Sequence, residues 1–157
     1  MFVYNLKKKD DIMEQEICMR INKSALYHKR LMQKILDRFD ITYAQYQVLK
    51  IIQEHPGLPA KEILVYLDSD KATLSGVLAR LEKNKLIKRK ANEQDKRLIH
   101  NHLTSKSMEF CSNIRGIEEA CANDLTEGIK PKELKIFMDV FNRIISNQVK
   151  KINDQDN

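Results

Sequence analysis

The segment from Ile41 to Leu103 constrains the fold of this chain most strongly, because local signals mark where its short elements begin and end. Thr42 and Gln45 form a capping-box pair, which predicts the start of a helix. Pro56-Gly57 is a turn signal that stops this helix. Pro59 suits the first position of a further short helix. Two helices separated by a tight break are therefore expected to open the segment.

A third helix is predicted after these two, with its apolar side chains on one face. Three consecutive residues are candidate N-caps for it, namely Asp68, Ser69 and Asp70. The apolar residues that follow at helical spacing are Leu74, Val77, Leu78 and Leu81. If this face packs against the rest of the protein, the opposite face of the helix is exposed to solvent.

Two strand-like runs follow the third helix, at residues 86–91 and 98–103. The loop between them is rich in Asn, Glu, Gln, Asp and Lys, so the two runs are expected to form a β-hairpin. Three helices followed by a hairpin are the element order of a winged helix-turn-helix. The expected fold class is therefore mainly α with a small β-hairpin wing (α+β).

Long helices with apolar stripes are predicted on both sides of this module. Apolar residues recur at steps of three and four over residues 11–39, Thr104 caps a second long helix, and Pro131 opens a third. Stripes of this width need a partner surface. The expected organisation is a single domain over residues 1–157, with flanking helices at residues 11–39 and 104–152 and the winged helix at residues 41–103.

The basic charge of the chain is concentrated in one short segment. The chain has 28 Lys and Arg against 22 Asp and Glu, a formal net charge of +6 and a pI near 9.2. Residues 83–97 hold seven of these Lys and Arg residues but only two acidic ones. Such a cluster favours a polyanionic partner, and the alternative is a solvated face without a ligand. Because the basic cluster lies in the predicted hairpin, double-stranded DNA is the favoured partner.

The outward face of the third helix carries small and polar side chains. Ala72, Gly76 and Ala79 allow the helix axis to approach base edges closely, while hydroxyl groups can bond to bases or phosphates. The alternative is that Ala and Gly mark a helix packed against another helix. The candidate DNA-binding residues on this helix are Lys71, Ala72, Thr73, Ser75, Gly76, Arg80 and Lys83.

The hairpin supplies a second set of candidate contacts. Arg97 closes its loop, two residues beyond Asp95, and the Asp95 carboxylate is expected to hold the Arg97 guanidinium in a fixed direction. A fixed arginine at a wing tip can enter the minor groove. The candidate phosphate-binding residues are Lys88, Arg89, Lys90 and Lys96.

Residues 41–104 resemble the MarR family of bacterial transcription regulators. The resemblance rests on ITYAQYQVLKII, PGLPAKEI, DKATLSGVLARLEKNKLIKR and EQDKRLIHNHLT in unbroken order. It implies a homodimer whose terminal helices interlock, so that two winged helices face successive major grooves of a pseudo-palindromic operator. Lys85 stands where a glycine is usual before the first wing strand, so a left-handed backbone is expected there.

The function expected from these features is sequence-specific transcriptional regulation, most simply repression, relieved by a small-molecule effector or a redox signal. Cys18, Tyr27 and Tyr43 resemble the peroxide-sensing branch of the family, which makes them candidate redox-sensor residues. The alternative for Cys18 is a small buried thiol, because it lies on the apolar stripe of its helix. The alternative function is a winged-helix module that binds protein without sequence-specific DNA binding.

Other classes of protein find little support in the sequence. The chain has no catalytic motif, so an enzyme is not expected, and no cofactor is predicted. His100 and His102 share one strand face, but two imidazoles alone make a weak metal site, and a solvated face is the preferred interpretation. Without a signal-like start or a long apolar run, a soluble cytoplasmic protein with no membrane partner is expected. Cys18, Cys111 and Cys121 are an odd set without CxxC spacing, which indicates free thiols.

Overall fold

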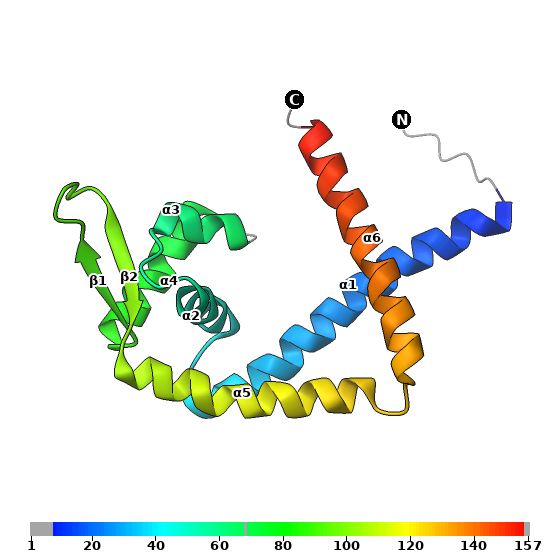
Figure 1. Ribbon diagram of the computed structural model, residues 1–157, viewed down its shortest axis with the longest axis horizontal. Coiled ribbons are helices and arrows are strands. Elements are labelled where there is room, and N and C mark those ends of the chain that lie inside the picture. The colour runs from blue at the N-terminus through cyan, green and yellow to red at the C-terminus, as the bar shows by residue number, and fades with distance from the viewer. Residues whose placement is uncertain (1–7, 68, 156–157) are drawn as a thin grey trace. The chain divides into compact units, whose positions relative to one another are not determined.

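The computed structural model describes residues 8–67 and 69–155 (Figure 1). The chain divides into two compact units, residues 1–112 and 113–157. The single-domain organisation stays a prediction, and Asp68, one of the candidate caps, lies outside the described residues. The helices are α1 (Lys8–Leu36), α2 (Tyr43–Glu54), α3 (Ala60–Ile63), α4 (Lys71–Lys83), α5 (Ser105–Thr126) and α6 (Pro131–Gln155), with 3-10 turns η1 (Asp37–Phe39) and η2 (Leu64–Tyr66) and strands β1 (Ile87–Ala91) and β2 (Ile99–Leu103).

The start of α2 is fixed by the predicted capping box. Thr42 Oγ1 accepts a hydrogen bond from the Gln45 backbone N–H at 3.2 Å, and Gln45 Oε1 accepts one from the Thr42 N–H at 2.8 Å. Gln33 of α1 holds the same junction, because its side chain donates to the Ile41 carbonyl and accepts from the Tyr43 N–H. These bonds satisfy donors that a helix start leaves open.

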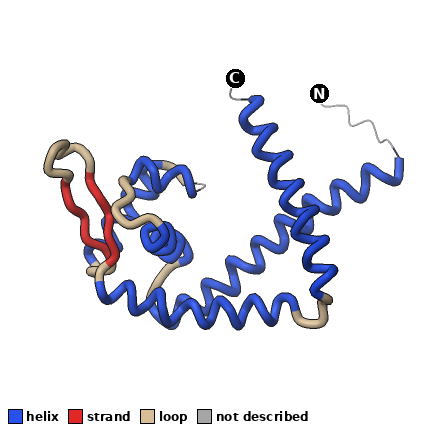
Figure 2. The backbone as a smooth tube through the Cα atoms, in the orientation of Figure 1, coloured by secondary structure: helices blue, strands red, loops and turns tan. Residues whose placement is uncertain are grey.

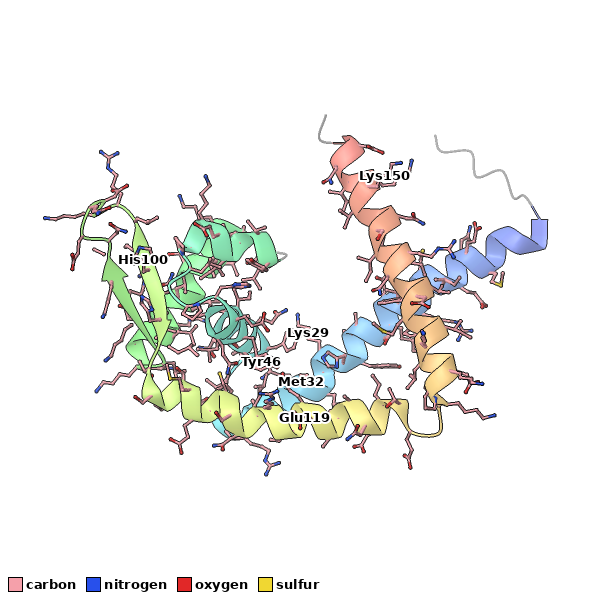
Figure 3. The ribbon with its side chains drawn as sticks, in the orientation of Figure 1. Lys29, Met32, Tyr46, His100, Glu119 and Lys150 are labelled. Carbon is pink, nitrogen blue, oxygen red and sulfur yellow. The ribbon has the colours of Figure 1, made fainter. Side chains whose placement is uncertain are left out.

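The core of the first unit forms where α2 packs against α1, α4 and β2. Met32 of α1 and Tyr46 of α2, both labelled in Figure 3, are buried in it. The other fully buried side chains in this unit are almost all aliphatic: Leu36, Val48, Leu49, Ile52, Ile63, Leu74, Leu78, Leu81 and Ile87. Burial of such side chains is the main force that holds the short elements together.

The short helix α3 begins one residue later than predicted. Pro59 is its N-cap with an extended backbone, not its first helical residue. The physical reason is a long-range one, because Pro59 also forms an isolated antiparallel bridge with His100 of β2. The helix then tightens into η2, which ends before Leu67.

The end of α4 explains how the chain turns into the hairpin. Lys85 has φ of +58°, as expected at a position where glycine is usual. The Lys85 N–H bonds to the Glu82 carbonyl at 2.9 Å, and the Leu86 N–H bonds to the Leu81 carbonyl at 2.8 Å. These two bonds and the burial of both leucines make a Schellman ending.

The hairpin pairs β1 with β2 in antiparallel register from Ile87↔Leu103 to Ala91↔Ile99. Only the N-terminal residue of β1, Ile87, is buried, so the rest of the strand faces solvent. Thr104 and Ser107 link the base of the hairpin to the start of α5. The Thr104 hydroxyl donates to the Lys85 carbonyl at 2.8 Å, and the Ser107 hydroxyl donates to the Leu86 carbonyl at 2.6 Å. The mainly helical winged-helix fold predicted from the sequence is confirmed.

The second unit contains the end of α5 and all of α6. Gly128, at φ +75°, follows the end of α5, and Pro131 starts α6 as predicted. The apolar stripe predicted for this helix needs a partner surface, and the chain by itself leaves the apolar side chains of α6 exposed or half-buried. Its exposed large apolar side chains are Ile136, Phe137, Met138, Val140, Ile145, Val149 and Ile152. Within the described residues, no helix has the length and apolarity needed to span a membrane.

Candidate nucleic-acid interface

Helix α4 presents the outward face that the sequence predicts. Leu74, Leu78 and Leu81 are buried and Val77 is half-buried. A Cβ added at Gly76 would meet no atom within 4 Å, so space next to this position is open. The interpretation of α4 as a helix with its small residues packed inward is therefore wrong for the chain as described. All seven candidate residues on this helix are exposed: Lys71, Ala72, Thr73, Ser75, Gly76, Arg80 and Lys83.

The N-terminus of α4 is capped by Asp70. Its Oδ1 accepts from the Thr73 backbone N–H at 2.8 Å, and its Oδ2 accepts from the Thr73 hydroxyl at 2.7 Å. The Thr73 side chain and backbone bonds hold the pKa of the Asp70 carboxyl below its ordinary value of 3.8. The Thr73 hydroxyl proton is thus directed at Asp70, and its oxygen lone pairs remain open to a further donor.

The loop at the tip of the hairpin, drawn in tan between the red strands of Figure 2, is ordered by side chains of its own. Asn92 Oδ1 accepts from the N–H groups of Gln94 at 2.8 Å and Asp95 at 3.0 Å. Asp95 Oδ1 then accepts from the Arg97 backbone N–H at 3.0 Å. Successive side-chain-to-backbone bonds of this kind define the loop from Asn92 to Leu98.

One sequence expectation about this loop needs correction. Asp95 was expected to hold the Arg97 guanidinium, but its carboxylate bonds to the Arg97 backbone instead. The spacing of two residues suits an Asx turn, in which the carboxylate reaches the main chain before it can reach a long side chain. Asp95 therefore fixes the position of the Arg97 backbone, and the Arg97 residue itself is exposed.

The basic residues of the hairpin lie along β1 and in the loop at the tip, and all of them are exposed. Arg89 differs from its neighbours because its Nη1 lies 3.5 Å from Glu82 Oε2 of α4. Both side chains are partly solvated, so this ion pair contributes little to stability, about 0–1 kcal/mol. It joins β1 to α4 and offsets a carboxylate charge that would repel phosphate. The exposed candidates of the hairpin are Lys88, Arg89, Lys90, Asp95, Lys96 and Arg97.

Sequence reasoning missed the polar contacts between β2 and the turn after α2. His100 was interpreted as a residue of a solvated strand face, but its ring bonds to the Gly57 carbonyl and to Asn92. Asn101 is buried, and its Nδ2 donates to the Leu58 carbonyl at 2.8 Å. No group of three or more His, Cys, Asp or Glu side chains placed to hold a metal occurs among the described residues.

Comparison with known proteins identifies the family of this chain. Residues 41–99 match the model of the MarR family. The organic hydroperoxide resistance transcriptional regulator of Bacillus subtilis is 30% identical over 122 residues, which are 73% of this chain and 83% of that protein. This chain belongs to the MarR family. The regulator MgrA of Staphylococcus aureus is also 30% identical, over 96 residues that are 60% of this chain and 65% of MgrA.

Solved structures share the fold of this MarR-family chain. A MarR protein from Peptoclostridium difficile has a TM-score of 0.80 at 19% identity and covers 96% of this chain and 94% of its own. A Staphylococcus aureus MepR–DNA complex has a TM-score of 0.72 at 23% identity and covers 82% of this chain and 93% of that one. The relatives are named as transcriptional regulators, and this chain is a DNA-binding transcriptional regulator of the same family, not an enzyme.

The candidate redox residues of this MarR-family chain are not brought together within one chain. Cys18 is exposed, so no part of its own chain buries the thiol. Tyr27 lies nine residues further along α1, about 13 Å along a helix axis. Tyr27 and Tyr43 instead lie beneath the ammonium groups of Lys23 and Lys29, at 5.5 and 6.0 Å from the ring centres.

The other two cysteines differ from Cys18 in their surroundings. Cys111 is buried, whereas Cys121 is only half-buried. Burial raises the pKa of the Cys111 thiol, although the positive charge of Lys50 acts in the opposite direction. Since the thiolate is the reactive form, Cys111 is a poor nucleophile.

Proposed function

We propose that this chain is a homodimeric repressor that binds a pseudo-palindromic operator and is released by a redox or small-molecule signal. The observation that carries the proposal is the exposed small and polar face of α4, which lies next to a basic hairpin in the same unit. A helix with such a face can enter the major groove while the hairpin follows the adjacent backbone.

The contacts are divided between the two elements. On α4, Ala72, Ser75 and Gly76 allow close approach to base edges, while Lys71, Arg80 and Lys83 reach phosphates or bases. On the hairpin, Lys88, Lys90 and Lys96 bind phosphates, and Arg97 enters the minor groove. The helix supplies most of the sequence information, and the lysines supply affinity that falls with salt.

The apolar side chains exposed on α1 and α6 support the homodimer. They include Met13, Leu26 and Leu31 on α1 and Phe137, Val149 and Ile152 on α6. Exposed apolar side chains in such numbers along helices are typical of a surface that a partner covers. Two-fold symmetry then places two copies of α4 in half-sites about one turn of DNA apart.

The first experiment measures the affinity for duplex DNA at several salt concentrations, with an operator selected from a random pool by the protein itself. The affinity should fall steeply as salt rises, because binding releases counterions. Arg97→Ala should weaken binding about tenfold or more, whereas Lys96→Ala, at the neighbouring exposed position, should weaken it only a few-fold. An affinity that depends neither on salt nor on Arg97 would support the protein-binding alternative.

The second experiment concerns the release signal. The relative from Bacillus subtilis is named for organic hydroperoxide resistance, and the exposed Cys18 is the cysteine of this chain most open to oxidation. Organic hydroperoxide should release the protein from DNA, and Cys18→Ser should abolish the release. Cys111→Ser is the matched control and should leave it intact. Release that persists in Cys18→Ser would rule out the thiol switch and leave a small-molecule effector.

A further inference from the structure

We propose that His100 and Asn92 are positioning residues of the wing. Together they join the hairpin loop to the turn at Gly57 by hydrogen bonds. The loop backbone is thereby held in place, and so is the point from which the Arg97 side chain projects. This inference rests on the proposed role of Arg97 in DNA binding. It assigns no DNA contact to either residue, because each acts through the loop that carries Arg97.

The geometry of the tie is a continuous series of short hydrogen bonds. His100, labelled on β2 in Figure 3, places Nδ1 2.6 Å from the Gly57 carbonyl oxygen and Nε2 3.0 Å from Asn92 Nδ2. On its other side, Asn92 Oδ1 accepts from the backbone N–H groups of Gln94 and Asp95. The imidazole therefore connects a turn and a loop whose residues are more than thirty positions apart in the sequence.

The partners of His100 determine its tautomer. A carbonyl oxygen only accepts, so Nδ1 carries the proton and donates to Gly57. The Oδ1 of Asn92 faces two N–H donors, so its Nδ2 faces the ring and donates to an unprotonated Nε2. The tautomer with the proton on Nδ1 satisfies both partners of the ring. In the other tautomer, the Nε2–H would face the N–H of Asn92 Nδ2, and the Gly57 carbonyl oxygen would lose its donor.

The turn that receives His100 is itself held firmly. Gly57 has φ of +88°, and a Cβ at this position would meet His102 Cε1 at 3.2 Å, so the β2 side chains pack closely against it. The Gly57 N–H bonds to the Asn101 carbonyl at 2.9 Å, and Asn101 Nδ2 bonds to the Leu58 carbonyl. The loop is thus tied to a turn that is itself hydrogen-bonded to β2. The bond from the Arg97 N–H to Asp95 then fixes the Arg97 backbone within the same loop.

The test on DNA uses the intact protein and a double-mutant cycle. His100→Phe keeps the ring and removes both nitrogen atoms, and it should weaken operator binding about threefold to tenfold. Gln94→Ala is the control in the same loop, because it changes an exposed side chain and leaves the backbone N–H that bonds to Asn92 in place, and it should change binding by less than about twofold. In an Arg97→Ala background, the effect of His100→Phe should largely disappear, because a positioning residue acts only through the residue that it positions. An undiminished effect in that background would overturn the proposal.

Two measurements without DNA keep this inference separate from the proposed function. The ¹⁵N resonances of the His100 ring in the unmodified protein should report the Nδ1–H tautomer. In His100→Phe and in Asn92→Ala, the amide protons of Gln94 and Asp95 should exchange faster with solvent, while those of α2 should not. A different tautomer, or unchanged exchange in both variants, would overturn the proposal. If instead Arg97→Ala has no effect on DNA binding, the proposed function of Arg97 fails while these two results still stand.

Discussion

At the scale of single residues, Lys85 shows how a local requirement of the fold can override a residue's preference. The Schellman ending of α4 needs a left-handed backbone at this position, and Lys85 adopts it with φ of +58°. An L-residue pays about 1–2 kcal/mol for this conformation, whereas glycine adopts it freely. The Lys85 side chain is exposed, and only its backbone takes part in the hydrogen bonds that join α4 to the hairpin.

The replacement Lys85→Gly is therefore expected to stabilise the protein by about 1 kcal/mol. Lys83→Gly is the matched control, since it removes the same charge two residues earlier, at the last residue of α4. It should destabilise by about 1 kcal/mol, because glycine is a poor helix former. Urea denaturation at one fixed protein concentration measures both changes. If both variants lose stability equally, the left-handed backbone at Lys85 is not a source of strain.

At the scale of single elements, α4 depends on its cap for the geometry of its first turn. Asp70 bonds to both the backbone N–H and the hydroxyl of Thr73, and these bonds hold its pKa below the ordinary value of 3.8. Because the folded state binds this proton less readily than the unfolded state, the cap stabilises the fold above about pH 4. That stabilisation is lost as the pH falls through the lower, folded-state pKa of Asp70.

The replacement Asp70→Asn tests this linkage. Asparagine caps helices nearly as well as aspartate but does not titrate. Between pH 5 and pH 3, as rough bounds of the titration of an aspartate, the free energy of unfolding should fall less in the variant than in the unmodified protein. All other carboxylates are the same in the two proteins. Subtracting one curve of unfolding free energy against pH from the other therefore leaves the contribution of Asp70 alone. Parallel curves over this range would show that the ionised Asp70 does not stabilise the fold.

The same scale separates what the sequence could predict from what it could not. Local signals located the elements well, because the capping box at Thr42, the stop at Pro56-Gly57 and the start at Pro131 all act over a few residues. The tie through His100 escaped prediction because it joins residues 43 positions apart. Asp95 was assigned the wrong partner on Arg97, because spacing alone does not distinguish a backbone donor from a side-chain donor in a tight turn.

At the scale of the whole molecule, the exposed apolar side chains of α6 indicate what the chain lacks by itself. Phe137 and Phe141 stack on each other at 5.4 Å, yet Phe137 remains 57% exposed. We propose a second copy of the chain as the cover for this face, and a dimer would present two copies of α4.

This reasoning predicts that Phe137→Glu produces a monomer with weak operator binding. A carboxylate in the apolar face of α6 cannot be buried without a partner, so association should be lost. Ser146→Glu adds the same charge nine residues later, which is about 180° around the helix, and should leave the dimer intact. Light scattering measures the mass of each variant. A monomer binds only one half-site at a time, so operator binding by Phe137→Glu should be weakened about 10²-fold. Operator binding by the control should change little. An unmodified protein that is monomeric at the concentrations where it binds its operator would contradict the proposed dimer, and α6 would then need another partner.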